Sequence, residues 1–325
     1  MIYIACPAFC ATGGTELLHQ LYSHLKIRTD KVKIYYTGLE SGKNPIPESF
    51  IKYEVEWVDQ ISDVEGDVLI YPEVNAHLFS RLHRIKSVCW WLSADNYSEQ
   101  RKILRPRLLQ FMNSFLLQLE PNSIFSNKKI THLAQCNYTI DYLSKKGVVA
   151  DYLSDYLNEL YLNEPVEYSS NARENVVLYN PKKGIEYTRR IMQNAANTKF
   201  VPIENMSQRQ IIDRMKSSKV YIDFGNHPGK DRIPREASIM GCIVIAGLRG
   251  SAKFESDLPI PETSKFAVRN SSLIGIVAKI NEAFANYDNV ISGYEEHRKM
   301  IRLEKSRFET DLALIWDKHI REYAE

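Results

Sequence analysis

The chain has 325 residues, of which 44% are hydrophobic and 25% charged, and its formal net charge is +2. This length exceeds one ordinary α/β core and suits two domains of about 150 residues each. The nearly neutral balance excludes the strongly basic character typical of nucleic-acid-binding proteins, so no nucleic-acid partner is expected.

The five cysteines are odd in number and scattered, which is typical of free thiols in a reducing compartment, so a cytoplasmic protein is expected. They are Cys6, Cys10, Cys89, Cys136 and Cys242. No Cys or His partners accompany them at the spacing of a zinc site, and no metal is expected. No run of about 20 apolar residues occurs, so no membrane span is expected. A peripheral association with the inner face of the cell membrane stays open.

The first half of the chain alternates short apolar runs with helical patterns, as stacked βαβ units do. Strands are predicted at residues 2–5, 32–37, 55–58, 68–71, 88–92 and 123–126. Leucines at helical spacing occupy residues 17–25, and residues 98–119 carry helical periodicity between the last two strands. The stretch 148–170 is rich in Tyr, Asp and Asn and lacks a clean period, so it is interpreted as the crossing between two domains.

A second alternating set follows this crossing. Strands are predicted at 176–179, 200–203, 220–224, 243–246 and 266–268, and helices at 185–196, 208–216 and 235–240. The pattern predicts an α/β protein with Rossmann-like domains at 1–160 and 161–300, whose parallel sheets face each other across a cleft. Apolar residues at helical spacing predict a C-terminal helix within 301–325 that packs back on the first domain. Ligands of such sheets bind at the carboxyl ends of the strands.

The turn Gly13-Gly14 lies directly after the first predicted strand and opens a helix. Glycine lets the backbone approach a ligand closely, and a helix N-terminus offers free N–H groups to a phosphate or carboxylate. The alternative is a tight turn that needs glycine for its geometry alone. The turn is not the GxGxxG fingerprint, and no acidic residue closes the next strand, so a nicotinamide enzyme is not expected.

The richest stretch of polar residues is 223–246, where a strand leads through a Gly- and Pro-containing loop into a helix that begins near Pro234. The loop carries His227, Lys230 and Arg232, and Glu236 lies in the first turn of the helix. Cationic groups at a strand end and a helix N-terminus suit a diphosphate, and Glu236 could accept hydrogen bonds from ribose hydroxyls. The alternative is a solvated loop with a glutamate that caps the helix.

Three segments together resemble the retaining GT-B superfamily of nucleotide-sugar glycosyltransferases. They are Gly-Gly-Thr-Glu at 13–16, Lys183-Gly184 after the strand at 176–179, and the Glu-Ala helix with its following Gly and Val-Ile-Ala strand at 234–246. The resemblance implies the GT-B fold and a nucleotide-sugar donor whose ribose contacts Glu236. It also implies that Lys183 binds the diphosphate together with Lys230 or Arg232. For Lys183 itself, a solvated turn is the alternative.

The sequence departs from this family at Pro228, where the family motif has a second glutamate eight residues before Glu236; Asn226 or Asp231 is the nearest polar substitute. The contacts to the donor sugar are therefore open. The pair His227-Pro228 also resembles the His-Pro pair with which bacterial sialyltransferases bind a cytidine monophosphate donor. A CMP-sugar therefore stays an alternative donor.

In the first half, residues 90–97 run from a buried strand into a polar loop expected to face the cleft. Trp90 and Trp91 could stack on sugar rings or belong to the core. Asp95 is the candidate catalytic residue, because a carboxylate there could orient an acceptor hydroxyl and take its proton. Capping of the loop is the alternative role for Asp95.

The predicted function is transfer of a sugar from a nucleotide-sugar donor to a hydroxyl of a glycan or lipid-linked glycan acceptor. The setting that this resemblance implies is bacterial surface polysaccharide biosynthesis, such as lipopolysaccharide or capsule. No cofactor is expected, and the absence of an Asp-x-Asp triplet predicts a metal-independent reaction. Two alternatives stay open: a nucleotide-sugar epimerase using Asp95 and His227, and a non-catalytic nucleotide-binding partner of a polysaccharide assembly complex.

Overall fold

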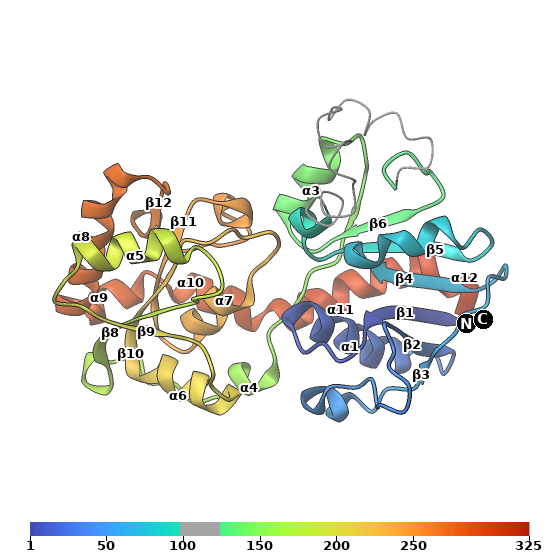
Figure 1. Cartoon of the computed structure of the whole chain (residues 1–325), viewed down its shortest axis with the longest axis horizontal. Helices are drawn as coiled ribbons and strands as arrows, with labels where there is room; N and C mark the ends of the chain where they lie inside the picture. The colour runs from blue at the N-terminus through green and yellow to red at the C-terminus, as the bar shows by residue number, and fades with distance from the viewer. Residues whose placement is uncertain (98–123, 325) are drawn as a thin grey trace. The chain divides into compact units, whose positions relative to one another are not determined.

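The computed structural model describes residues 1–97 and 124–324, which form two compact units (Figure 1). The first unit comprises Met1–Asp155 and Ser306–Glu325, and the second comprises Tyr156–Lys305. Each unit is built on a parallel β-sheet, of seven strands in the first and five in the second. The predicted α/β class with two parallel sheets is therefore confirmed.

The first sheet has the order β3-β2-β1-β4-β5-β6-β7, and its neighbouring strands are parallel. Its strands are β1 (Ile2–Pro7), β2 (Val32–Thr37), β3 (Trp57–Val58), β4 (Val68–Pro72), β5 (Lys86–Trp91), β6 (Thr131–Ala134) and β7 (Asp151–Tyr152). The central strands β1, β4 and β5 are buried almost throughout, which explains their continuous apolar sequences. The direction of strand addition reverses between β1 and β4, and this switch point is where a doubly wound sheet places its ligand.

The helical segments of the first unit include α1, which begins at Gly13 because Thr12 caps it. Thr12 and Thr15 form a capping box, in which each side chain accepts a hydrogen bond from the backbone N–H of the other. Among the residues that the structure describes, the helical segments of this unit include α1 (Gly13–Lys26), η1 (Glu48–Tyr53), η2 (Glu73–Ser80), α3 (Asn137–Ser144), the π-helical η9 (Trp316–Ile320) and α12 (Arg321–Ala324).

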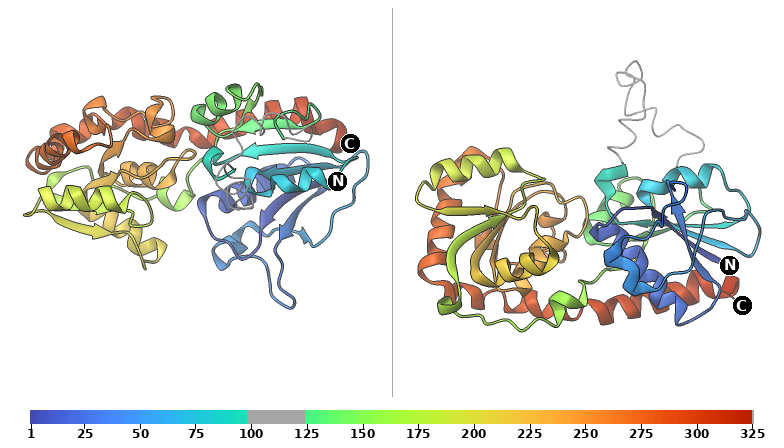
Figure 2. Two further views of the ribbon diagram at one scale, coloured as in Figure 1. Left: turned by 45° about the horizontal axis from the view of Figure 1, so that its top comes forward. Right: turned by 60° about the horizontal axis from the view of Figure 1, so that its bottom comes forward.

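The chain returns to the first unit within α11 (Glu304–Ile315). Phe308 is fully buried, with its ring centroid 5.1 Å from that of His24 on α1 and 6.3 Å from that of Trp90 on β5. Farther along, Lys318 and His319 both form ion pairs with the carboxylate of Asp151. These contacts fix the last helices against the first sheet, so that α12 and the start of β1 lie side by side (Figure 2).

The last two strands of the first sheet differ from the sequence prediction. The strand predicted at 123–126 is wrong, because residues 124–126 form a turn and the strand is β6 at Thr131–Ala134. The apolar side chain of Phe125 packs against the core instead, where its ring stacks on Trp91 with the ring centroids 5.6 Å apart. The expected interdomain crossing at 148–170 contributes β7 to the first sheet before the chain enters the second unit. The helix predicted at 98–119 lies outside the described residues.

The second sheet has the order β12-β11-β10-β8-β9, again with parallel neighbours. Its strands are β8 (Glu174–Tyr179), β9 (Lys199–Pro202), β10 (Ser218–Asp223), β11 (Ile243–Gly247) and β12 (Lys265–Phe266). The chain lays down β8 and then β9 on one side, and returns past β8 to begin β10 on the other. The switch point therefore lies between β8 and β10, and the loops that follow these two strands meet there.

Helices cover both faces of the second sheet. In Figure 1, α5 and α8 lie over one face and α6 and α7 over the other, as right-handed crossovers in opposite directions require. The helical segments are α4 (Glu159–Leu162), η5 (Ser170–Ala172), α5 (Ile185–Asn194), α6 (Gln208–Ser217), α7 (Arg232–Ile239), η6 (Gly250–Lys253), η7 (Glu262–Ser264), η8 (Asn270–Ser272), α8 (Leu273–Ala285), α9 (Tyr287–Ser292) and α10 (Glu295–Arg302). The helix predicted at 235–240 thus begins three residues earlier, at Arg232.

Candidate functional site

The two loops at the switch point of the second sheet touch each other at Gly184 and Gly225. A Cβ atom on Gly184 would lie 2.5 Å from the backbone nitrogen of Gly225, and Gly184 has a φ of +65°. Both observations require glycine at position 184. The close approach brings Lys183, which follows β8, next to the residues that follow β10.

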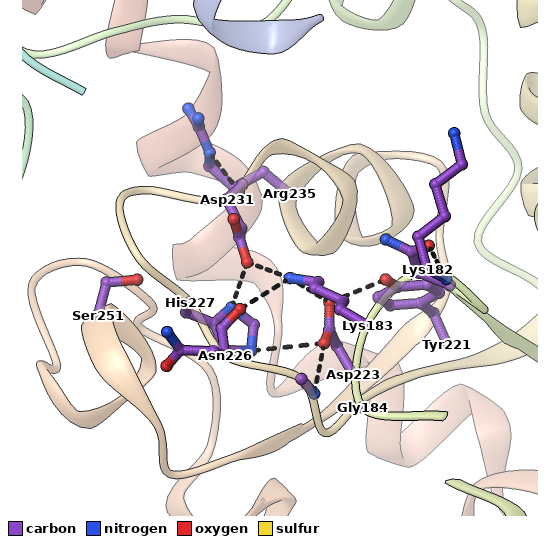
Figure 3. Close-up of polar contacts among 12 residues, drawn as sticks. Lys182, Lys183, Gly184, Tyr221, Asp223, Asn226, His227, Asp231, Arg235 and Ser251 are labelled. Atoms are coloured by element: carbon purple, nitrogen blue, oxygen red, sulfur yellow. Dashed lines mark hydrogen bonds and ion pairs between the residues drawn. The ribbon is translucent and has the colours of Figure 1, made fainter. Parts of the chain in front are cut away.

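Lys183 lies at the centre of a polar cluster with Asp223, His227 and Asp231 (Figure 3). Its Nζ atom lies 3.0 Å from Oδ2 of Asp223 and forms a second ion pair with Asp231. Nδ1 of His227 lies 2.7 Å from Oδ2 of Asp231. Burial by itself would lower the pKa of Lys183, but the two carboxylates outweigh burial and raise this pKa. Lys183 therefore stays a cation whose charge two aspartates balance.

Asp223 is the most deeply placed member of this cluster. Its side chain is 1% exposed, and it accepts hydrogen bonds from the Tyr221 hydroxyl and the Gly225 backbone N–H, each 3.0 Å long. The sequence analysis did not select Asp223, and it named Asp231 only as a substitute for the missing glutamate. An aspartate that ends an otherwise apolar strand is the signal that could have identified Asp223, because burying a carboxylate requires nearby donors or cations.

The cluster also contains the ligand types that a divalent cation takes. Ligand atoms of Asp223, His227 and Asp231 all lie within 4.8 Å of one another. Nε2 of His227 is buried and has no hydrogen-bond partner among the described residues, and it lies 3.6 Å from Oδ1 of Asp223. Lys183, however, already supplies both aspartates with a positive charge, so a metal ion at this position would have to displace the lysine. We therefore interpret the cluster as an ion-pair network.

The other predicted cations of this loop are directed elsewhere in the second unit. Nζ of Lys230 lies 2.8 Å from Oε1 of Glu304, and the same carboxylate forms a 2.6 Å ion pair with the buried Arg235. Arg232 donates a hydrogen bond to the backbone carbonyl of Tyr156. Glu236 lies on α7 and is partly buried. The structure thus groups Lys183 with His227, and pairs Lys230 with a glutamate that sequence reasoning missed.

In the first unit, Gly13 and Gly14 form the N-terminus of α1 beside the switch point. Neither glycine has a positive φ. A Cβ atom on Gly14 would meet the Leu92 side chain at 3.7 Å, an ordinary van der Waals distance. Backbone geometry therefore gives no reason for glycine at position 14.

Glu73 lies across the same switch point, directly after β4, and sequence reasoning missed it. Its side chain is buried, and Oε2 accepts a 2.8 Å hydrogen bond from the backbone N–H of Leu92. Burial raises the pKa of Glu73 to about 7. The carboxyl group therefore ties the end of β4 to the loop after β5, and it titrates near neutral pH.

That loop after β5 carries Asp95, which is partly exposed. The Tyr138 hydroxyl, at the start of α3, donates a 2.6 Å hydrogen bond to Oδ1 of Asp95. Trp90 and Trp91 are fully buried, so their packing interpretation is correct and stacking on a sugar is wrong. Their indole N–H groups donate to the Leu153 carbonyl and to the His132 ring, respectively.

Two parallel α/β units, each with polar side chains at the switch point of its sheet, define the GT-B fold. Solved structures share it over nearly the whole chain. They include a sucrose-phosphate synthase from Thermosynechococcus elongatus (TM-score 0.63, 12% identity, covering 98% of this chain and 99% of that chain). A glycosyltransferase from Rickettsia africae is also similar (TM-score 0.56, 14% identity, covering 97% of each chain). The third is Anabaena HepE in complex with UDP and glucose (TM-score 0.60, 11% identity, covering 98% of this chain and 99% of that chain).

At such low sequence identity, these structural similarities establish the fold alone. The reaction has to be argued from the residues of the site. No family model matches the chain, and the search of curated proteins found no match. Among the helices that the structure describes, none has the length and apolar character needed to cross a membrane.

Proposed function

We propose that this chain is a glycosyltransferase that moves a sugar from a nucleotide-sugar donor to a hydroxyl group of a glycan acceptor. The observation that carries the proposal is the cluster of Lys183, Asp223, His227 and Asp231 at the switch point of the second sheet. Ligands of doubly wound sheets bind at such points. The complex of Anabaena HepE with UDP and glucose supports a nucleotide-sugar donor for this fold.

In this proposal the donor lies on the second unit. Lys183, with Lys230 or Arg232, stabilises the departing diphosphate, and Glu236 accepts hydrogen bonds from the ribose. His227, on the same loop as Lys230, also takes part in donor binding. Such a reaction needs stabilisation of the charge that develops on the leaving phosphate, which cationic side chains provide without a metal. A bound diphosphate would compete with Asp223 and Asp231 for the Lys183 ammonium group.

The acceptor lies on the first unit in the same proposal. Asp95 accepts a hydrogen bond from the attacking hydroxyl and draws off its proton, and Tyr138 orients the carboxylate. Gly13 and Gly14 let an anionic group approach the N-terminus of α1. The reaction needs no cofactor besides the donor.

The proposed setting is the assembly of a bacterial surface polysaccharide, with a glycan or a lipid-linked glycan as the acceptor. The reaction would take place in the cytoplasm, at the inner face of the membrane where the acceptor is lipid-linked. The departure from the family motif at Pro228 leaves both a retaining and an inverting outcome open, and NMR spectroscopy of the product would distinguish them.

Thermal-shift measurements with UDP-, GDP-, dTDP- and CMP-sugars identify the donor, because a ligand that binds only the folded state raises the melting temperature. Titration of the preferred nucleotide into Glu236→Gln should then show at least about tenfold weaker binding, since hydrogen bonds to a charged group are worth roughly 1.5–3 kcal/mol. Binding of none of the four nucleotide sugars would contradict the proposal. Conversion of the donor without any acceptor would favour an epimerase, and nucleotide binding without hydrolysis or transfer would favour a non-catalytic partner.

A further inference from the structure

A pocket of about 380 Å³ opens at the carboxyl edge of the second sheet, beside the Lys183 cluster. Its wall combines the first turn of α5, at residues 184–187, with the loops after β11 and β12. Arg190, one turn farther along α5, also lines the pocket, and Arg249 and Arg269 line it from the two loops. Sequence reasoning selected none of the three arginines.

The pocket carries an excess of positive charge. Three guanidinium groups and one carboxylate, Glu186, line it. Arg190 donates a 3.0 Å hydrogen bond to the neutral side chain of Asn270, which leaves its charge uncompensated. Arg249 and Arg269 are exposed and form no ion pair with any residue in the described ranges 1–97 and 124–324.

The cations of the neighbouring loop differ in this respect. Lys183 is balanced by Asp223 and Asp231, and Lys230 by Glu304. A ligand anion must therefore compete with carboxylates for Lys183 and Lys230, whereas Arg249 and Arg269 face no such competitor. An uncompensated guanidinium group gains more from a phosphate than a group already in an ion pair.

The backbone of the pocket favours the same ligand. Gly184 is the N-cap residue of α5 and has no side chain to accept from the N–H groups of the first turn. These N–H groups and the positive end of the helix dipole are suited to an anion. The Tyr187 hydroxyl donates a 2.7 Å hydrogen bond to the backbone carbonyl of Arg269, which fixes the far wall against α5.

We propose that this pocket binds a phosphoryl group through Arg249 and Arg269, with Arg190 and the first turn of α5 completing the site. The inference deepens the proposed function and rests on it for the source of the phosphate. That source is either the diphosphate of the nucleotide sugar or a phosphate carried by the acceptor. Both present the same chemistry to the arginines.

Isothermal titration of inorganic pyrophosphate tests the pocket with no assumption about the reaction. We expect pyrophosphate to bind the parent protein and to bind the double variant Arg249→Ala/Arg269→Ala at least about tenfold more weakly, because two charge-assisted interactions are lost. Arg189→Ala, also exposed but outside the pocket lining, is the matched control and should bind as the parent does. Since the arginines are exposed, the melting temperature of the double variant should equal that of the parent.

Pyrophosphate binding that is absent from the parent, or unchanged in the double variant, would overturn the proposal. A parallel titration with UDP separates the two sources. If the double variant weakens UDP binding as well, the donor diphosphate occupies the pocket; if it weakens only pyrophosphate binding, the phosphate belongs to the acceptor. Glu236→Gln should weaken UDP binding and leave pyrophosphate binding intact, and an unchanged UDP affinity there would contradict the proposed donor site without affecting the pocket.

Discussion

Nζ of Lys183 lies 3.0 Å from the buried carboxylate of Asp223, so the lysine expected to bind a diphosphate is also an internal counter-ion. Two roles for one side chain have different experimental signatures. Loss of a counter-ion lowers the stability of the folded protein, whereas loss of a ligand contact lowers affinity alone. Measuring both quantities on the same variants distinguishes the roles.

Lys183→Met should lower the free energy of unfolding by about 3 kcal/mol, because it leaves the Asp223 carboxylate buried without its cation. Urea denaturation at pH 7 measures this change. Lys182→Met is the matched control, since Lys182 is exposed on the same loop and should cost little. Adding Asp231→Asn to Lys183→Met should restore part of the loss. Equal stability of the two lysine variants would argue against the internal ion pair.

Gly184→Ala should affect the stability of the fold, whereas Gly14→Ala should affect ligand binding. Gly184→Ala should destabilise the fold by more than about 1 kcal/mol, because its φ is positive and its Cβ would collide with Gly225. Gly14→Ala should leave stability unchanged or slightly higher, since alanine fits the helical backbone there. If Gly14 admits an anionic ligand, Gly14→Ala should nevertheless weaken nucleotide-sugar binding. Unchanged affinity in a stable Gly14→Ala variant would remove α1 from the site.

Glu73 should make the protein less stable as the pH rises through 7. Its pKa of about 7 in the folded protein exceeds the ordinary value of 4.5, so the folded state holds the proton more tightly. The resulting stabilisation is complete below pH 4.5 and disappears above pH 7. Between pH 5 and pH 8 the parent should lose about 2–3 kcal/mol relative to Glu73→Gln. Unfolding free energies that run parallel for the two proteins over this range would refute the assignment.

His297 should act in the opposite direction at acidic pH. It is buried on α10, and neither ring nitrogen has a hydrogen-bond partner among the residues that the structure describes. Burial, followed by the charges of Arg235 and Lys230, lowers its pKa to about 3. As the pH falls, His297 is therefore protonated in the unfolded chain before it is protonated in the folded protein. The free energy of unfolding is highest above pH 6.5 and falls as the pH decreases toward 3.

His297→Leu removes this titration. From pH 6.5 to pH 5 the parent should lose about 2 kcal/mol relative to the variant. Because His297→Leu is itself a core substitution, the comparison uses the difference between the two pH values and not the absolute stability. An identical pH dependence in both proteins would show that His297 is protonated normally.

Asp95→Asn should lower turnover by about 10²–10⁴-fold if Asp95 takes the proton of the acceptor hydroxyl. Nucleotide affinity should stay nearly unchanged, because the proposed donor contacts belong to the second unit. Tyr138→Phe removes the 2.6 Å hydrogen bond that orients this carboxylate, and should reduce turnover less severely. Normal turnover of Asp95→Asn would end the acceptor-base hypothesis. A lowered melting temperature with normal turnover would identify Asp95 as a loop-capping residue.

Local patterns in the sequence determined most of the elements. Apolar runs located the central strands, because a strand buried on both faces must be apolar throughout. Helical spacing of leucines located α1, and Gly184 marked a turn that the backbone requires. The strand prediction at 123–126 was wrong because Phe125 is an apolar residue that packs against Trp91 and does not belong to a strand. Burial alone does not distinguish these two uses of a hydrophobic side chain.

Tertiary structure decided which of these residues meet. Lys183 and Asp223 are 40 positions apart, and they pair because the chain passes β8 on its way from β9 to β10. The same strand order gathers Arg190, Arg249 and Arg269 around one pocket. Glu73 and Leu92 meet because β4 and β5 are neighbours. Strand order depends on contacts between residues distant in sequence, and a local pattern carries no record of such contacts.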